Sequence, residues 1–182
     1  MKHLLFYFIA FLSLNMYSQE KYLTRSGRVN FEASVPSFEE VKAINNSATA
    51  ILNGSNGELA ALVLVKGFRF KNALMEEHFN ENYAESDQFP KATFIGKIEN
   101  FHSEQLNTTH QNVVLKGQLT FHGETKPIEV NNLTFSKESN VIVMSGSFKV
   151  KAEDFSVKIP KIVRNKVSET IDVSFNFELK QK

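Results

Sequence analysis

Apolar and polar side chains alternate along much of the chain, which predicts β-strands. The clearest run lies near the C-terminus, where polar residues separate the apolar positions Ile171, Val173, Phe175, Phe177 and Leu179. Residues 27–34 and 113–121 show the same period of two. This period is typical of strands with one dry and one solvated face, as in antiparallel sheets.

Turn-forming segments separate these runs at the spacing of β-hairpins. Three of them stand between apolar runs, namely Asn53–Gly57, His122–Pro127 and Lys137–Asn140. Gly and Asn tolerate the positive φ angles that tight hairpin turns require. A series of consecutive hairpins is a meander, which favours an antiparallel barrel or sandwich over a parallel α/β sheet.

Two segments depart from the alternation and predict helical structure. Ser37–Ile44 indicates one or two helical turns, with Ser37 as the N-cap and Glu40 completing a capping box. Phe70–Tyr83 is the better helix candidate, because its apolar residues share one helical face. Pro90 closes this region, since proline disfavours helix at the residue before it.

The run from Leu59 to Val65 is apolar at every position, so both faces of this strand are expected to be covered. The barrel interior would cover one face. The helix predicted at 70–83 follows at once and is the natural cover for the other. The pattern as a whole therefore predicts an all-β barrel with one short covering helix.

The N-terminal residues have the order of a secretory signal peptide. A short basic start at Lys2 precedes the apolar run Leu4–Leu14, which is well short of the roughly 20 residues that a membrane helix needs. The small residue Ser18 marks the cleavage site, which makes 1–18 a signal peptide and 19–182 a single domain. We therefore expect a periplasmic or secreted protein with no stable membrane span and no lipoprotein cysteine.

Composition excludes several classes of function. With no cysteine in 182 residues, stability must come from core packing, and thiol catalysis and Cys-based metal sites are excluded. The 21 basic and 20 acidic residues nearly cancel, so net charge gives no electrostatic case for nucleic acid or for anionic membrane surfaces. Phenylalanine is abundant, at 17, while tryptophan is absent, which favours core packing or an oily lining over sugar stacking.

Catalytic and metal-binding patterns are not recognisable in the sequence. His102 and His110 flank a predicted loop, but a metal there would need a third ligand such as Glu104, so solvated loop histidines are favoured. His78 lies among acidic residues on the predicted helix, where an acid–base role would need a cleft and a partner. No GxSxG elbow and no phosphate loop is present. We predict no catalytic residue, no metal ligand and no enzymatic activity.

Basic and apolar residues are interleaved in one segment before the last strand. The segment contains Lys158, Ile159, Lys161, Ile162, Val163, Arg164 and Lys166. Two interpretations stay open for it, a contact with anionic groups at the mouth of the barrel and a solvated loop, of which the second is favoured.

Five short motifs follow one another along the chain: Gly27–Phe31, Lys66–Phe70, Leu74–Asn80, Phe89–Phe94 and Asp154–Pro160. Their order and spacing, rather than any single motif, resemble the YceI-like family over residues 20–182. The resemblance implies an exported bacterial protein with a lipocalin-like antiparallel barrel of about eight strands. It also implies an isoprenoid or other amphiphilic lipid as the ligand in an elongated apolar cavity, with no cofactor besides such a bound lipid.

Alternation within the strands identifies the side chains that would face such a cavity. The inward candidates for ligand binding are Phe31, Phe94, Leu115, Phe121, Phe148, Phe175 and Phe177. An eight-stranded barrel is just wide enough either to be packed by its own side chains or to hold one slender ligand. Bulky phenylalanines suit both arrangements.

Three hypotheses about function remain open at this point. The first is a carrier for an isoprenoid-type or other amphiphilic lipid. The second is a filled barrel that acts as an interaction or structural protein of the cell envelope, and the third is an enzyme that uses His78 or His102 with nearby carboxylates. A homodimer is left open, and nucleic acid is not an expected partner. An apolar ligand that co-purifies with the protein would separate the first hypothesis from the second.

Overall fold

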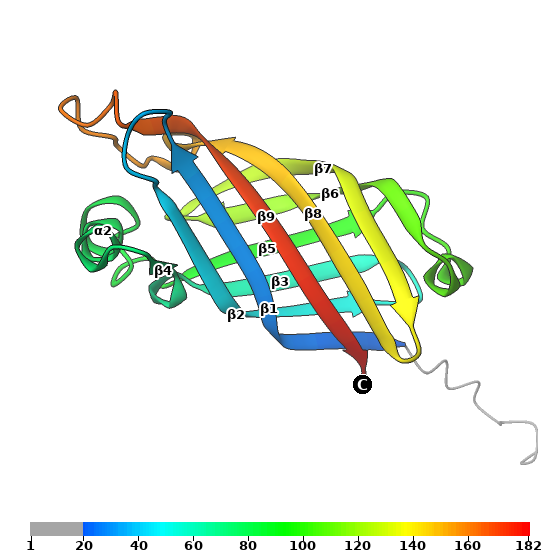
Figure 1. Cartoon of the computed structure of the whole chain (residues 1–182). Helices are drawn as coiled ribbons and strands as arrows, with labels where there is room; N and C mark the ends of the chain where they lie inside the picture. Colours follow the sequence, from blue (N-terminus) through cyan, green and yellow to red (C-terminus); the bar gives the residue numbers. More distant parts are fainter. Residues whose placement is uncertain (1–19) are drawn as a thin grey trace, which may run out of the picture.

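The strands of this chain close into one barrel. The computed structural model describes residues 20–182, so the predicted signal peptide lies outside the described residues. Eight strands form the wall (Figure 1): β1 (Lys21–Ser34), β2 (Lys42–Asn53), β3 (Glu58–Leu64), β5 (Lys91–Ile98), β6 (His110–Phe121), β7 (Glu124–Glu138), β8 (Val141–Lys151) and β9 (Val167–Gln181). A two-residue strand, β4 (Arg69–Phe70), pairs with β2 at one end.

Strand pairing is antiparallel around the whole barrel. Each wall strand pairs with the wall strand that follows it in the chain, and β1 pairs with both β2 and β9, which closes the sheet. Closure leaves the wall without an exposed edge. The prediction of an all-β, lipocalin-like antiparallel barrel of about eight strands is confirmed.

Successive strands run in opposite directions, so their connections fall alternately at the two ends of the barrel (Figure 1). Four connections meet at one end, which we call the mouth: 35–41, 65–90, 122–123 and 152–166. The opposite end, which we call the far end, holds the connections 54–57, 99–109 and 139–140.

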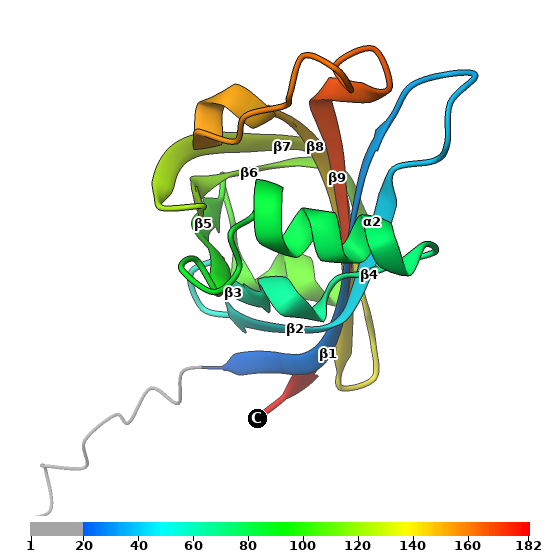
Figure 2. The same ribbon diagram turned by 90° about the vertical axis from the view of Figure 1, so that its left-hand side faces the viewer.

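A short helical segment lies across the mouth (Figure 2). The helix α2 (Ala73–His78) begins at Asn72, whose side-chain oxygen accepts a hydrogen bond of 2.9 Å from the backbone N–H of Leu74. It continues into the wider turn η2 (Phe79–Tyr83). The helix predicted at 70–83 is therefore present from residue 73. No helix within residues 20–182 is long and apolar enough to cross a membrane.

The helix covers the mouth and not the outer face of β3, so that part of the prediction is wrong. Leu59 and Val63 point into the barrel and are buried, whereas Ala60 and Leu64 face outward and Leu64 is 50% exposed. After β3 the chain turns across the barrel end through η1 (Val65–Gly67) and β4, which carries α2 away from the outer wall. An apolar run in a strand does not by itself require cover on both faces.

The helical turn predicted at Ser37–Ile44 is also wrong. This segment forms the loop between β1 and β2 and the start of β2. The N–H of Ala33 donates to the carbonyl of Val41 at 2.8 Å, and Ser37 has a φ of 74°, outside the range of a right-handed helix. Pairing of β1 with β2 outweighs the local capping pattern, because tertiary context overrides such weak preferences.

The predicted hairpins are present, and one is tighter than expected. The loop after Asn53 connects β2 to β3, and the turn after Glu138 connects β7 to β8. His122 and Gly123 alone form the turn between β6 and β7, with φ angles of 49° and 79° that match a two-residue hairpin turn. Pro127, predicted to lie in the loop, is part of β7.

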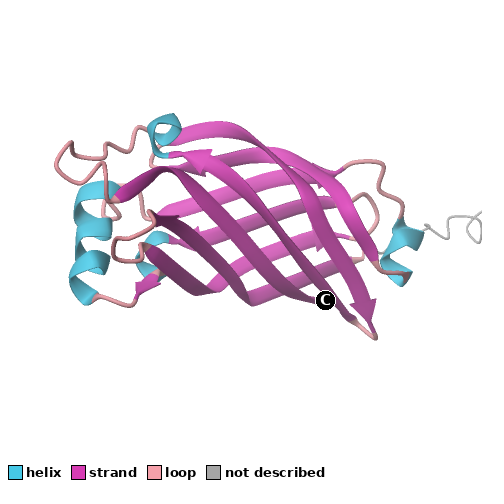
Figure 3. Ribbon diagram, turned by 45° about the horizontal axis from the view of Figure 1, so that its top comes forward, coloured by secondary structure: helices cyan, strands magenta, loops and turns pink. Residues whose placement is uncertain are grey.

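The far end of the barrel is packed by its own side chains. The turn η3 (Ser103–Asn107) lies at this end (Figure 3). Leu106 of the turn is buried. The strand ends add the fully buried residues Tyr22, Leu52, Ile98, Leu133, Phe135, Ile142, Met144 and Leu179. Burial of a large apolar side chain contributes roughly 1.5–3 kcal/mol, so this end is the main stabilising core.

Candidate ligand-binding cavity

A cavity of about 580 Å³ opens at the mouth and extends into the barrel. Small-molecule sites typically have volumes of roughly 300–1,000 Å³. The wall is built from side chains that strand alternation turns inward on β1, β3, β5, β6, β7, β8 and β9, together with residues of the mouth connections. Most of these side chains are Phe, Val, Leu, Ile or Ala, so the cavity offers dispersion contacts to an apolar ligand.

All seven residues predicted to face a cavity lie on this wall: Phe31, Phe94, Leu115, Phe121, Phe148, Phe175 and Phe177. Leu115, Phe175 and Phe177 are buried and form the deep floor, where the rings of the two phenylalanines stack with centroids 5.0 Å apart. The other four are partly buried on the side walls. Their orientation is therefore established, while their role in binding a ligand stays a prediction.

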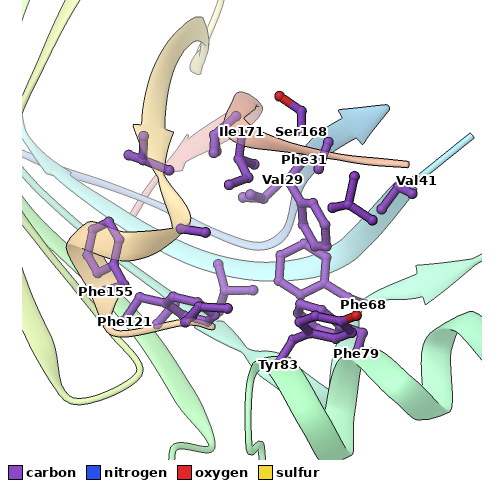
Figure 4. A pocket seen from close by; sticks show the side chains of 18 of the residues that line it. Val29, Phe31, Val41, Phe68, Phe79, Tyr83, Phe121, Phe155, Ser168 and Ile171 are labelled. Carbon is purple, nitrogen blue, oxygen red and sulfur yellow. The ribbon is translucent and has the colours of Figure 1, made fainter. Parts of the chain in front are cut away.

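Four phenylalanine rings, which we call the mouth cluster, meet where the barrel opens. They are Phe31 of β1, Phe68, Phe70 of β4 and Phe79 of η2. The Phe31 centroid lies 5.1 Å from those of Phe68 and Phe79 (Figure 4). It lies 5.7 Å from that of Phe70. Separations of about 4.5–7 Å are typical of aromatic pairs in contact. The mouth cluster thus packs the segment that crosses the opening against the barrel wall.

Sequence reasoning missed three members of the mouth cluster as cavity-lining residues. Phe68, Phe70 and Phe79 line the cavity, yet they come from the irregular connection between β3 and β5. Alternation assigns a face only within a regular strand. The signal that was available is the motif Lys66–Phe70, whose two phenylalanines are spaced by two, but only the fold brings them to the opening.

Polar groups on the cavity wall gather at the mouth. Eight come from the mouth connections or from the strand ends beside them: Glu39, Asn72, His78, Tyr83, Thr93, Lys151, Lys166 and Ser168. The charged lining residues Glu39, Lys151 and Lys166 are all in this set. The lining is consequently graded, with polar groups at the opening and apolar side chains towards the floor.

His122, in the connection 122–123, contacts residues of two other mouth connections, 65–90 and 152–166. Its side chain is only 8% exposed, with Nε2 2.7 Å from Oε2 of Glu85 and Nδ1 2.9 Å from the carbonyl oxygen of Phe155. The ring of Phe89 lies against the imidazole, with centroids 4.5 Å apart. Phe155 in turn faces Phe121 on the cavity wall, at 6.0 Å between centroids (Figure 4). This arrangement gives His122 a structural role at the rim that its position in a turn did not indicate.

The other three histidines of residues 20–182 are divided between the two ends of the barrel. His78 lies at the mouth, on α2, whereas His102 and His110 lie at the far end beside η3. There Nε2 of His110 is 2.7 Å from the hydroxyl of Thr108. Within residues 20–182, no three His, Asp or Glu side chains are grouped in a way that holds a metal ion.

Comparison with known proteins agrees with this architecture. A family model described as the YceI-like domain matches residues 22–179, which span the wall from β1 to β9. The chain belongs to the YceI-like family. The resemblance inferred from the order of motifs is thereby confirmed. No curated protein matches the sequence.

Several solved structures share the fold of this YceI-like barrel. A polyisoprenoid binding domain from Saccharophagus degradans, implicated in plant cell wall breakdown, has 15% identity and a TM-score of 0.73 over 90% of this chain and 99% of its own. BcnA from Burkholderia cenocepacia has 13% identity and a TM-score of 0.68 over 84% and 95%. The YCEI protein of Campylobacter jejuni has 16% identity and a TM-score of 0.60 over 81% and 88%. At these identities the likeness establishes the fold alone.

Proposed function

We propose that this YceI-like protein is an exported binding protein that holds an isoprenoid-type or other amphiphilic lipid in its cavity. The observation that carries the proposal is the graded lining, apolar towards the floor and polar at the mouth. An amphiphile can place its tail against such a wall and leave its polar end among the groups at the opening. The description of the Saccharophagus degradans domain as polyisoprenoid binding supports the same class of ligand.

The apolar wall is sufficient to hold a chain without a charged anchor. Each methylene taken out of water contributes about 0.8 kcal/mol, so ten of them contribute about 8 kcal/mol before the cost of ordering the ligand. The side-wall residues Phe31, Phe94, Phe121 and Phe148 are placed to contact the tail. Stacked Phe175 and Phe177 limit how deep the tail can reach.

A barrel filled by its own side chains, acting only through its surface, was the alternative from the sequence. The far end matches that description, since Leu106 and the side chains of the strand ends are buried there. The mouth half holds the cavity instead. This division favours a ligand-binding protein over a filled interaction module.

Native mass spectrometry followed by organic extraction tests lipid binding. We expect a bound species of defined mass in protein purified from its host, or after incubation with isoprenoid alcohols. Ala61→Phe places a ring inside the cavity, because Ala61 lines it. Ala60→Phe is the matched control, since Ala60 is exposed on the outer face of the same strand. The new ring would displace part of the lipid tail, and the loss of two buried methylenes alone weakens binding about 15-fold. Ala61→Phe should therefore release the lipid, while Ala60→Phe retains it.

Two outcomes would contradict lipid binding in this cavity. One is equal lipid content in the Ala61→Phe and Ala60→Phe proteins, which would place the ligand elsewhere. The other is a bare protein that takes up none of the added lipids, which would return the filled-barrel interaction protein as the better explanation.

Export is inferred from the order of charged, apolar and small residues in 1–18. Cell fractionation combined with intact-mass measurement tests it. We expect recovery outside the cytoplasm, from the periplasm or the medium, of a chain that begins at Gln19. A cytoplasmic chain that still begins at Met1 would contradict this part of the proposal.

A further inference from the structure

Large apolar side chains stand exposed on three of the connections around the mouth. Phe38 in the loop 35–41 is 44% exposed, Leu74 on α2 is 57% exposed, and Ile162 in the last connection is 85% exposed. Figure 2 shows these three connections arranged around the opening. Exposed apolar groups that surround the entrance of an apolar cavity indicate a contact surface rather than scattered surface residues.

Charge is distributed unevenly around the same rim. Ser156–Lys166, which we call the basic loop, contains Lys158, Lys161, Arg164 and Lys166 and no acidic residue. All four basic side chains are exposed, and the loop projects beyond the strands at the upper left of Figure 1. Arg164 lies 3.4 Å from Glu169, whereas the three lysines form no ion pair within the part of the chain that the structure describes.

The helical side of the rim carries the opposite charge. Glu76, Glu77 and Glu81 lie on α2 and η2, and of these Glu76 is paired with Arg69 at 2.9 Å. The near-neutral net charge of the chain therefore conceals a basic side and an acidic side of one opening. An anionic surface is attracted to the first and repelled by the second, which selects the basic loop as the point of contact.

We propose that the basic loop docks the mouth of the barrel onto a lipid bilayer with anionic headgroups. Each lysine or arginine close to such a surface strengthens binding about fivefold. Ile162, which follows Lys161, is placed to enter the boundary between headgroups and acyl chains. A bilayer is favoured over an acidic protein because Ile162 stands exposed among the basic residues beside the entrance of an apolar cavity, and an apolar phase accepts its side chain.

The basic loop also forms part of the cavity wall. Ile159, Val163 and Lys166 line the cavity, while Lys158, Lys161 and Ile162 are exposed and do not belong to its lining. A bilayer bound by the outer side chains would therefore lie beside the opening, and a lipid would move between bilayer and cavity without crossing water. This transfer of lipid between bilayer and cavity rests on the proposed function, whereas the docking of the basic loop does not.

Pelleting with vesicles tests the docking. The vesicles contain equal parts of phosphatidylglycerol and phosphatidylcholine, or phosphatidylcholine alone, at low and at high salt. We expect the protein to pellet with the anionic vesicles only, and less at high salt. Lys158→Gln combined with Lys161→Gln should weaken this binding about 30-fold, and Ile162→Ser should weaken it further. The matched control, Lys180→Gln with Lys182→Gln, removes the same charge at the far end and should bind like the unaltered protein.

Lipid content of the same proteins separates docking from cargo binding. We expect the Lys158→Gln, Lys161→Gln protein to retain its bound lipid in native mass spectrometry. An unaltered protein that holds lipid but fails to pellet with anionic vesicles would overturn the docking, and this is the outcome for a loop that recognises an acidic protein instead. Equal loss of pelleting in the far-end control would also overturn it. Pelleting by a protein that binds no lipid would support the docking and overturn the proposed function.

Discussion

The ring of Phe94 lies over Gly117 inside the barrel, across the pairing of β5 with β6. A methyl group placed on Gly117 would lie 2.5 Å from Cζ of Phe94 and 2.5 Å from the backbone oxygen of Ile95. Gly96, which is opposite Gly117 in the register, is covered by the same ring. The facing glycines leave the space that Phe94 occupies on the cavity wall, so the shape of the wall depends on the absence of two side chains.

Gly117→Ala is expected to destabilise the barrel by about 1–3 kcal/mol, because the added methyl group overpacks a filled site. In an open strand position the same change is neutral or stabilising, since alanine is less flexible than glycine when unfolded. Urea unfolding measures the difference. Gln118→Ala, at the exposed neighbouring position, is the control and should stay within about 0.5 kcal/mol. Equal stability of the two variants would show that Phe94 does not fill this space.

A second variant tests whether Phe94 is the group that clashes. Phe94→Ala removes the ring, so the cost of Gly117→Ala should be smaller in the Phe94→Ala background than in the unaltered protein. The contact with the backbone oxygen of Ile95 persists in both, so the cost should fall without vanishing. Interaction energies between contacting residues are typically about 0.5–3 kcal/mol, and additive costs would contradict the contact.

The direction in which side chains point could be predicted from the sequence. Whether an inward side chain meets packed neighbours or the open cavity could not. Phe177 and Leu179 belong to the same alternation on β9, and period two places both inside the barrel. Leu179 is packed at the far end, while Phe177 reaches the cavity floor. The difference arises because η3 places Leu106 in the far end, whereas none of the described residues 20–182 fills the mouth in the same way. Such long-range filling leaves no local pattern in the sequence.

The mouth shows the same limit of local patterns. The helix at 73–83 was recognisable by its spacing, but its place over the opening follows from the path of β4. His122 was recognisable only as a turn residue, because its partners Glu85 and Phe155 lie 37 and 33 positions away. The basic loop was visible as a run of charges, and a place at the mouth was one of two interpretations of it, but only the closed barrel shows that its residues line the cavity.

Phe79→Ala is expected to loosen the segment across the mouth. The change removes ring contacts with Phe31, Phe68 and Phe70. Since Phe79 is only partly buried, the cost should be about 1–3 kcal/mol, below that of a fully buried phenylalanine. Amide hydrogen exchange should become faster in residues 73–83 and stay unchanged in the strands at the far end. Any bound lipid should dissociate faster.

The exposed residue Glu77 provides the control for this prediction, because it lies on the same helix and contributes nothing to the mouth cluster. Glu77→Ala should leave both hydrogen exchange and lipid dissociation unchanged. If Phe79→Ala altered the exchange of the far-end strands as much as that of α2, the segment would be part of the global folding unit rather than a separately held cover.

Asn45→Ala is expected to destabilise the protein by about 1–3 kcal/mol, the cost of leaving buried polar groups unpaired. Asn45 is fully buried, and its amide donates to the carbonyl of Leu64 at 3.0 Å. Its oxygen accepts from the N–H of Ser47 at 2.8 Å. Thermal or urea unfolding measures the loss. Asn46→Ala is the matched control, because Asn46 is exposed and bonds only to exposed Arg28, and a loss as large as that of Asn45→Ala would contradict the argument.

His122→Ala is expected to separate the mouth connections without opening the far end. The substitution leaves the carbonyl of Phe155 and the carboxylate of Glu85 without their imidazole partner, at a cost of about 1–3 kcal/mol. Hydrogen exchange should therefore accelerate in residues 84–90 and 152–157, while the strand ends around η3 keep their protection. His102→Ala, an exposed histidine at the far end, should change neither region. The imidazole joins the connection 152–166 to the segment before β5. Unchanged exchange at 152–157 in the His122→Ala protein would therefore mean that this connection is held by its own packing against the cavity wall.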